Sequence, residues 1–91
     1  MAATMADTIE ARLRDAFAPT RLEVHDDSEQ HRGHGGFREG GGTHMRVVMR
    51  AAGLAGLNRV ERSRAVHKAL AAELAGGVHA LALDLGGPEE R

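Results

Sequence analysis

Residues 76–83 read Gly-Gly-Val-His-Ala-Leu-Ala-Leu, so two glycines lead directly into a short apolar segment. Paired glycines of this kind are typical of a helix end, where a left-handed residue closes the last turn. The apolar run that follows predicts a strand over residues 78–85. His79 lies near the start of this strand, where an imidazole is either packed at a sheet edge or offered to a metal.

The N-terminal part of the chain predicts a helix followed by a strand. Asp7 and Glu10 have the acceptor-then-glutamate spacing of a capping box. The apolar stripe of an amphipathic helix follows at Ile9, Leu13 and Phe17. Pro19 ends this helix, and residues 21–26 alternate between apolar and polar side chains, as in a half-buried strand.

Residues 27–43 form a segment with little apolar content. The segment contains six glycines: Gly33, Gly35, Gly36, Gly40, Gly41 and Gly42. A loop of this length inside a small domain is more often functional or disordered than a plain connection. It also carries His31 and His34, so we expect a flexible loop that either is solvated or supplies a metal ligand.

The second half of the chain predicts a strand, a helix and another strand. Strand character returns at residues 44–51, and Asn58 with Glu61 forms a second capping pair before a helix over residues 58–74. The buried stripe of this helix is predicted at Val66, Leu70 and Leu74. The order α-β-β-α-β implies an α+β fold in which helices cover one face of a three-stranded mixed sheet.

The length of 91 residues predicts a single domain over residues 1–91, with an ordered core at about 7–85 and a frayed tail at 86–91. The chain has no cysteine, which excludes disulfides, a thiolate zinc site and a self-contained iron–sulfur cluster. Any metal must therefore use histidine, carboxylate or ligands from another molecule. No apolar run is long enough to span a bilayer and no signal peptide is recognised, so we expect a cytoplasmic protein.

The formal net charge of −1 argues against general attraction to nucleic acid. One local exception lies at residues 59–68 of the predicted second helix, where a single acidic residue, Glu61, accompanies four basic ones: Arg59, Arg62, Arg64 and Lys68. These side chains are either a solvated helix face or a surface that meets a partner or DNA.

Three segments in this order resemble the BolA family. Residues 22–28 read Leu-Glu-Val-His-Asp-Asp-Ser, and residues 42–47 read Gly-Thr-His-Met-Arg-Val. Residues 69–74, Ala-Leu-Ala-Ala-Glu-Leu, lead to Val-His-Ala-Leu-Ala-Leu at 78–83, which is the most specific of the three. The resemblance extends over about residues 9–85.

The resemblance implies a fold similar to the class II KH domain and a non-enzymatic adaptor that forms a heterodimer with a monothiol glutaredoxin. A [2Fe-2S] cluster is then shared with glutathione and the glutaredoxin, in iron homeostasis or iron–sulfur trafficking. The family's cluster-facing positions correspond here to His79 and to either His31 or His34, with His44 as a supporting residue. The chain alone is expected to hold no cluster and to be a monomer or a weak homodimer.

The chain departs from the family pattern at several positions. Met45 stands where phenylalanine is usual, and Ser63 stands between Arg62 and Arg64 where a histidine is common. The C-terminal helix of many members is missing. These differences weaken any role that depends on an Arg-His-Arg surface, and they leave His79 unaffected.

Neutral imidazole suits iron, zinc and copper, and two histidines on one iron raise the reduction potential above that of a four-thiolate cluster. Because the ligands must be deprotonated, cluster loading should weaken as pH falls through the imidazole range. Two alternatives remain: a DNA-binding regulator that uses the basic helix over residues 58–74, and a zinc or copper protein that uses the loop histidines. The missing GXXG clamp of KH domains counts against the first of these.

Overall fold

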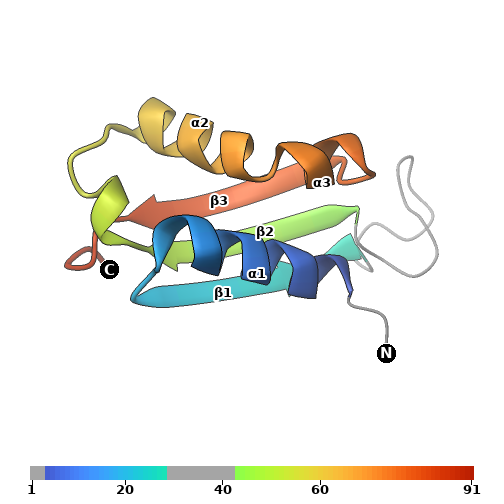
Figure 1. Ribbon diagram of the computed structural model, residues 1–91, viewed down its shortest axis with the longest axis horizontal. Coiled ribbons are helices and arrows are strands. Elements are labelled where there is room, and N and C mark those ends of the chain that lie inside the picture. The colour runs from blue at the N-terminus through green and yellow to red at the C-terminus, as the bar shows by residue number, and fades with distance from the viewer. Residues whose placement is uncertain (1–3, 29–42) are drawn as a thin grey trace.

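A computed structural model describes residues 4–28 and 43–91, and it shows two layers, with helices on one face of a three-stranded sheet (Figure 1). The predicted α+β architecture and the order of its elements are therefore confirmed. In chain order the elements are α1 (Met5–Phe17), β1 (Arg21–Asp26), β2 (His44–Arg50), the 3-10 turn η2 (Ala52–Leu54), α2 (Arg59–Ala69), α3 (Ala71–Ala75) and β3 (Ala80–Gly86).

The strands lie in the order β1-β2-β3, so β2 is central and the other two strands are edges. β1 pairs with β2 in antiparallel register, with Val24 opposite Val47. β2 pairs with β3 in parallel register, with Val47 opposite Leu83. A parallel pair cannot be joined by a tight turn, and the crossover here is made by η2, α2 and α3.

The core lies between the helices and the inner face of β2. Alternate side chains of β2 point to this face, and three of them, Met45, Val47 and Met49, are buried. The helix stripes predicted from the sequence meet them through Ile9, Leu13, Val66 and Leu70, which are also buried. Phe17 and Leu74, the last members of the two stripes, are partly buried against this core.

The two capping predictions had different outcomes. Asn58 caps α2 as expected: its side chain accepts from Glu61 N at 2.9 Å, and the Glu61 carboxylate accepts from Asn58 N at 2.8 Å. At α1 the predicted cap, Asp7, was wrong. Thr4 is the N-cap, and Asp7 is the residue three positions later whose carboxylate closes the same capping box, so the helix begins one turn earlier.

The predicted second helix is divided in two. Leu70 has φ −104° and ψ 19°, outside the helical range, and it separates α2 from α3. Of the two glycines that follow, Gly76 has φ −93° and Gly77 has φ 132°, so only Gly77 uses the freedom of glycine.

β3 begins two residues later than predicted. It starts at Ala80, so Val78 and His79 precede the strand instead of opening it. Val78 is buried and anchors the turn, with its N–H 3.4 Å from the Glu73 carbonyl oxygen. His79 therefore lies between a buried anchor and the first paired residue of the strand.

The prediction of a frayed tail from residue 86 was wrong. Gly86 is the last residue of β3, and the chain then folds back so that Gly87 N donates to the Glu90 carboxylate at 2.8 Å. Arg62 Nη2 donates to the same carboxylate at 3.0 Å, and Arg50 Nε donates to the Glu90 carbonyl oxygen at 3.1 Å. Two arginines thus hold a segment whose composition alone indicates no structure.

Acid should release this tail. Hydrogen bonds from Arg62 and from the Gly87 amide hold the pKa of Glu90 below its ordinary value. Because the folded-state pKa is depressed, the stabilisation is present above the unfolded-state pKa and is lost as pH falls through the folded-state value. In a carboxyl-carbon NMR titration, Arg62→Gln should move the Glu90 midpoint upward, whereas Arg64→Gln on the same helix should not. An unchanged midpoint in Arg62→Gln would show that the tail is held without this interaction.

Candidate functional site

One end of the sheet gathers the residues that the sequence singled out. β2 and β3 are parallel and both begin at this end, so His44 and His79 meet although they lie far apart in the sequence. The described chain also stops at Ser28 and resumes at Thr43 here, beside the same strand ends (Figure 1). The other two predicted ligands, His31 and His34, lie outside the described residues.

The side chain of Ser28, just after β1, is hydrogen-bonded to the backbone at the start of β2. Its side chain is fully buried, and its Oγ accepts from Thr43 N at 3.0 Å and from His44 N at 3.1 Å. Asp27 N donates to the His44 carbonyl oxygen at 2.8 Å, and Asp26 Oδ1 accepts from Ser28 N at 2.9 Å. This clasp, formed by Ser28, Thr43 and His44, was not predicted, although a serine and a threonine that flank a glycine-rich segment were a usable signal.

Hydrogen bonds connect the Ser28 hydroxyl, through the Thr43 hydroxyl, to the imidazole of His44. Thr43 Oγ1 lies 3.2 Å from Ser28 Oγ and 3.0 Å from His44 Nδ1. A serine hydroxyl has two lone pairs, and both of those on Ser28 are taken by backbone N–H groups. Thr43 Oγ1 therefore lies between the buried Ser28 hydroxyl and the His44 ring and connects the two.

His79 combines a fixed backbone with an exposed side chain. Its N–H donates to the Thr43 carbonyl oxygen at 2.7 Å, and Ala80 N donates to the same oxygen at 3.1 Å. The preceding residue, Val78, is buried. The imidazole of His79 is therefore held at the sheet end without being packed there, as a surface ligand requires.

His44 and His79 lie close but are not spaced as two ligands of one tetrahedral metal ion. Their ring centroids are 6.4 Å apart and their planes are tilted by 34°. In a tetrahedral site the two centroids would be roughly 5 Å apart, because each ligating nitrogen lies about 2 Å from the metal. Within residues 4–28 and 43–91 no three histidine, aspartate or glutamate side chains form a metal-binding group. The described site is thus one exposed imidazole with a neighbouring, hydrogen-bonded one.

The four basic residues of α2 do not form one surface. The side chain of Arg62 is only 15% exposed and donates to the Leu54 carbonyl oxygen at 2.9 Å and to the Leu85 carbonyl oxygen at 3.4 Å. Together with its ion pair to Glu90, these contacts give Arg62 a structural role, and its place in a partner or nucleic-acid surface stays a prediction. The other three, Arg59, Arg64 and Lys68, are exposed.

Arg50 is a buried cation that the sequence analysis did not identify. Its side chain is 5% exposed, and its guanidinium donates to the Asp84 carboxylate at 2.9 Å and to the carbonyl oxygens of Met49 and Asp84, both at 3.0 Å. The sequence of β2 does not reveal that Arg50 is buried, because Arg46 alternates with apolar residues in the same way and is exposed.

Within the part of the chain that the structure describes, no helix has the length and apolar character to cross a membrane.

Comparisons with known proteins agree on one family. Residues 13–90 match the family model described as BolA-like protein. A Sinorhizobium protein, described as an uncharacterized protein in the cobS 5' region, is 46% identical over 88 residues, which cover 96% of this chain and 95% of that protein. The DNA-binding transcriptional regulator BolA of Vibrio cholerae is 39% identical over 77 residues, covering 85% of this chain and 69% of that protein.

The structural comparison gives the same result. The BolA domain of SufE1 from Arabidopsis thaliana superposes with a TM-score of 0.86 at 30% identity, and the match covers 100% of both chains. The chain spans only 57% of the length of the mammalian relatives that it matches.

Removal of the clasp hydroxyl should destabilise the protein. Ser28→Ala leaves two backbone N–H groups at the site without their acceptor, which should lower the free energy of unfolding by about 2 kcal/mol. Ser63→Ala is the matched control, because Ser63 lies on helix α2 and accepts no backbone N–H there. Urea unfolding of the three proteins tests this expectation, and equal losses in both variants would contradict the role given to Ser28.

Proposed function

The chain belongs to the BolA-like protein family, and from this premise we propose that it is an adaptor that binds a monothiol glutaredoxin and shares a [2Fe-2S] cluster with it. His79 supplies one ligand in this proposal, and either His31 or His34 supplies a second. The observation that carries the proposal is His79 itself, an exposed imidazole on a backbone fixed by Val78 and by the Thr43 carbonyl oxygen.

The donor set of this chain fits part of a cluster site. Imidazole nitrogen is an established ligand for iron, and two histidines on one iron occur in a known class of [2Fe-2S] centre. The chain has no cysteine, so the remaining ligands must come from the glutaredoxin and glutathione. A bound cluster would supply electron storage or transfer of iron and sulfide, and the part of this chain is to hold one side of it.

Chain connectivity allows either loop histidine to reach His79. His31 follows Ser28 by three residues, which span at most about 11 Å, and His34 follows it by six, which span at most about 21 Å. Ser28 is held at the sheet end by its bonds to Thr43 and His44. Both candidates therefore remain in the proposal.

His44 is proposed as a support for the site and not as a ligand. Its Nδ1 is engaged by Thr43, and its ring lies 6.4 Å from that of His79. A supporting residue of this kind orients the ligand and tunes the charge around it, and its loss commonly weakens metal binding by about 10- to 100-fold.

DNA binding is a second candidate, and one observation favours it. Arg59, Arg64 and Lys68 remain exposed on α2, and the similar Vibrio cholerae protein is named a DNA-binding transcriptional regulator. Since Arg62 is occupied by the tail and the net charge is −1, such binding would be weak and would fall steeply with salt. Zinc or copper binding by His31 and His34 alone is the third candidate.

Anaerobic cluster reconstitution with a monothiol glutaredoxin and glutathione tests the main proposal. Visible circular dichroism of the mixture should differ from that of the glutaredoxin alone, because histidine replaces a thiolate at the iron. The difference should be lost in His79→Ala and in one of His31→Ala and His34→Ala, which identifies the loop ligand. In His44→Ala, cluster occupancy should fall without the spectrum reverting to that of glutaredoxin.

His25→Ala is the matched control, because His25 lies on β1, which β2 separates from β3, and its imidazole bonds to Glu23. It should leave the spectrum of the complex unchanged. A spectrum that the wild-type chain does not alter would refute the shared cluster. DNA binding that weakens in Arg59→Gln, Arg64→Gln and Lys68→Gln would then favour the second candidate.

A further inference from the structure

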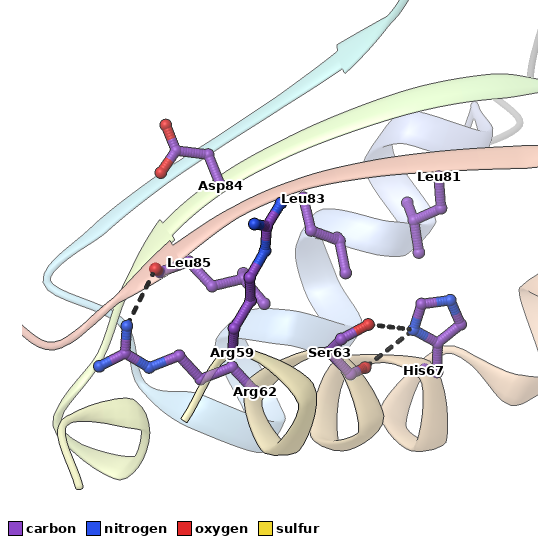
Figure 2. A pocket seen from close by; sticks show the side chains of 8 residues that line it. All are labelled: Arg59, Arg62, Ser63, His67, Leu81, Leu83, Asp84 and Leu85. Carbon is purple, nitrogen blue, oxygen red and sulfur yellow. Dashed lines mark hydrogen bonds between the residues drawn. The ribbon is translucent and has the colours of Figure 1, made fainter. Parts of the chain in front are cut away.

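We propose that the groove between α2 and β3 binds an extended acidic segment of a partner protein, which adds to the sheet as a fourth strand beside β3. The groove has a volume of about 540 Å³ and is lined by two elements (Figure 2). Its α2 wall is formed by Arg59, Arg62, Ser63 and His67, and its β3 wall by Leu81, Leu83, Asp84 and Leu85. The proposal concerns a different surface from that of the cluster and does not depend on it.

The backbone of β3 offers an open edge to this groove. Even-numbered residues pair with β2, since Ala80 N donates to the Thr43 carbonyl oxygen and Ala51 N donates to the Gly86 carbonyl oxygen. In a parallel ladder alternate residues direct their N–H and C=O groups to opposite sides. The groups of Leu81 and Leu83 therefore face away from β2, where the described part of the chain has no further strand.

The position of these groups matches what an added strand needs. Leu81 and Leu83 are two residues apart, which is the repeat at which one strand bonds a neighbour. The third outward residue, Leu85, already receives Arg62 Nη1 at its carbonyl oxygen, which marks the closed end of the edge. Peptides that bind by strand addition use such main-chain bonds for affinity and alternate side-chain pockets for specificity.

The side chains make the groove apolar on the strand side. Figure 2 shows Leu81, Leu83 and Leu85 pointing from β3 toward α2, and all three are only half-buried. Their remaining apolar surface is available to a partner residue that points into the groove. On α2, Val60 is 56% exposed and precedes the lining residues Ser63 and His67 by three and seven positions, so it lies on the same face of the helix.

The charges that border the groove favour an acidic occupant. The two nearby carboxylates are already neutralised, because Asp84 pairs with Arg50 and Glu90 pairs with Arg62. Arg59 reaches across from α2 toward Leu83 in Figure 2, and no carboxylate of residues 4–28 or 43–91 pairs with it. An unpaired guanidinium over an apolar floor complements a peptide that alternates acidic and apolar residues.

His67 gives the other end of the groove a compatible polar group. Its Nδ1 lies 2.8 Å from the Ser63 carbonyl oxygen, which can only accept, so this nitrogen carries the proton in the neutral ring. Nε2 is then an acceptor beside Leu81 and suits a peptide N–H or a protonated carboxyl. Apart from this imidazole the groove has no aromatic ring on which a base could stack, which favours peptide over single-stranded nucleic acid.

Selection from a phage library of random 12-residue peptides against the full-length chain tests the proposal. The enriched peptides should alternate acidic with apolar residues. A synthetic copy of the strongest binder should slow hydrogen exchange at the amides of Leu81 and Leu83, because these amides would become bonded to it. Failure to enrich any peptide with this pattern would overturn the proposal.

Two variants and one control measure separately how much the charge of Arg59 and the open edge of β3 contribute to peptide binding. Arg59→Glu should weaken binding of that peptide about tenfold by reversing the charge at the groove. Leu83→Pro should also weaken it at least tenfold, because proline is tolerated on an edge strand but removes the outward N–H. Arg14→Glu, an equal charge change on the exposed surface of α1, should change the affinity less than twofold.

Three further results would reject the proposed occupant. Peptide binding that both groove variants leave unchanged would place the peptide elsewhere. Tight binding of a 12-nucleotide single strand that Arg59→Glu abolishes, without peptide enrichment, would assign the groove to nucleic acid. A concentration-dependent dimer in sedimentation that Leu83→Pro abolishes would assign the edge to a second copy of this chain.

Discussion

The parallel pairing of β2 with β3 determines most of what this small domain presents to its surroundings. It begins at the Thr43 carbonyl oxygen, which accepts from both His79 N and Ala80 N. Because parallel strands start at the same edge, two histidines far apart in sequence become neighbours at one end of the sheet. β3 is the last strand in the order β1-β2-β3, and within residues 4–28 and 43–91 no other strand pairs with its outer edge. The candidate ligand and the open strand edge thus have one structural origin.

Two buried polar side chains, Ser28 and Arg50, hold the two ends of β2 by hydrogen bonds. Ser28 links the ends of β1 and β2 by accepting two backbone N–H groups, and Thr43 Oγ1 connects its hydroxyl to the His44 ring. Arg50, at the other end of β2, binds Asp84 and the carbonyl oxygen of Glu90 and so holds the C-terminal segment. A domain with a core of mostly aliphatic side chains gains fixed strand ends from these contacts.

Local patterns in the sequence predicted the elements well and the tertiary contacts poorly. The alternation over residues 21–26 gave the bounds of β1, and the Asn58 cap was correct, since both depend on neighbouring residues. The cap at Thr4 was missed because Asp7 belongs to the same box from its other side. The fixed tail and the occupied Arg62 depend on partners far along the chain, which periodicity and composition do not reveal. The position of His79 ahead of β3 is likewise a consequence of pairing to Thr43.

The chemistry available at the sheet end favours transient over permanent holding of a metal group. A chain without cysteine that offers imidazole from an exposed position contributes the weaker and more readily protonated part of a mixed ligand set. In the proposed complex such a half-site would gain affinity from the thiolates that the partner brings. Buried Val78 and the Thr43 carbonyl oxygen fix the backbone at His79, so the proposed complex would find this imidazole already in place. An adaptor needs this combination, since its own fold must not depend on the cargo that it shares.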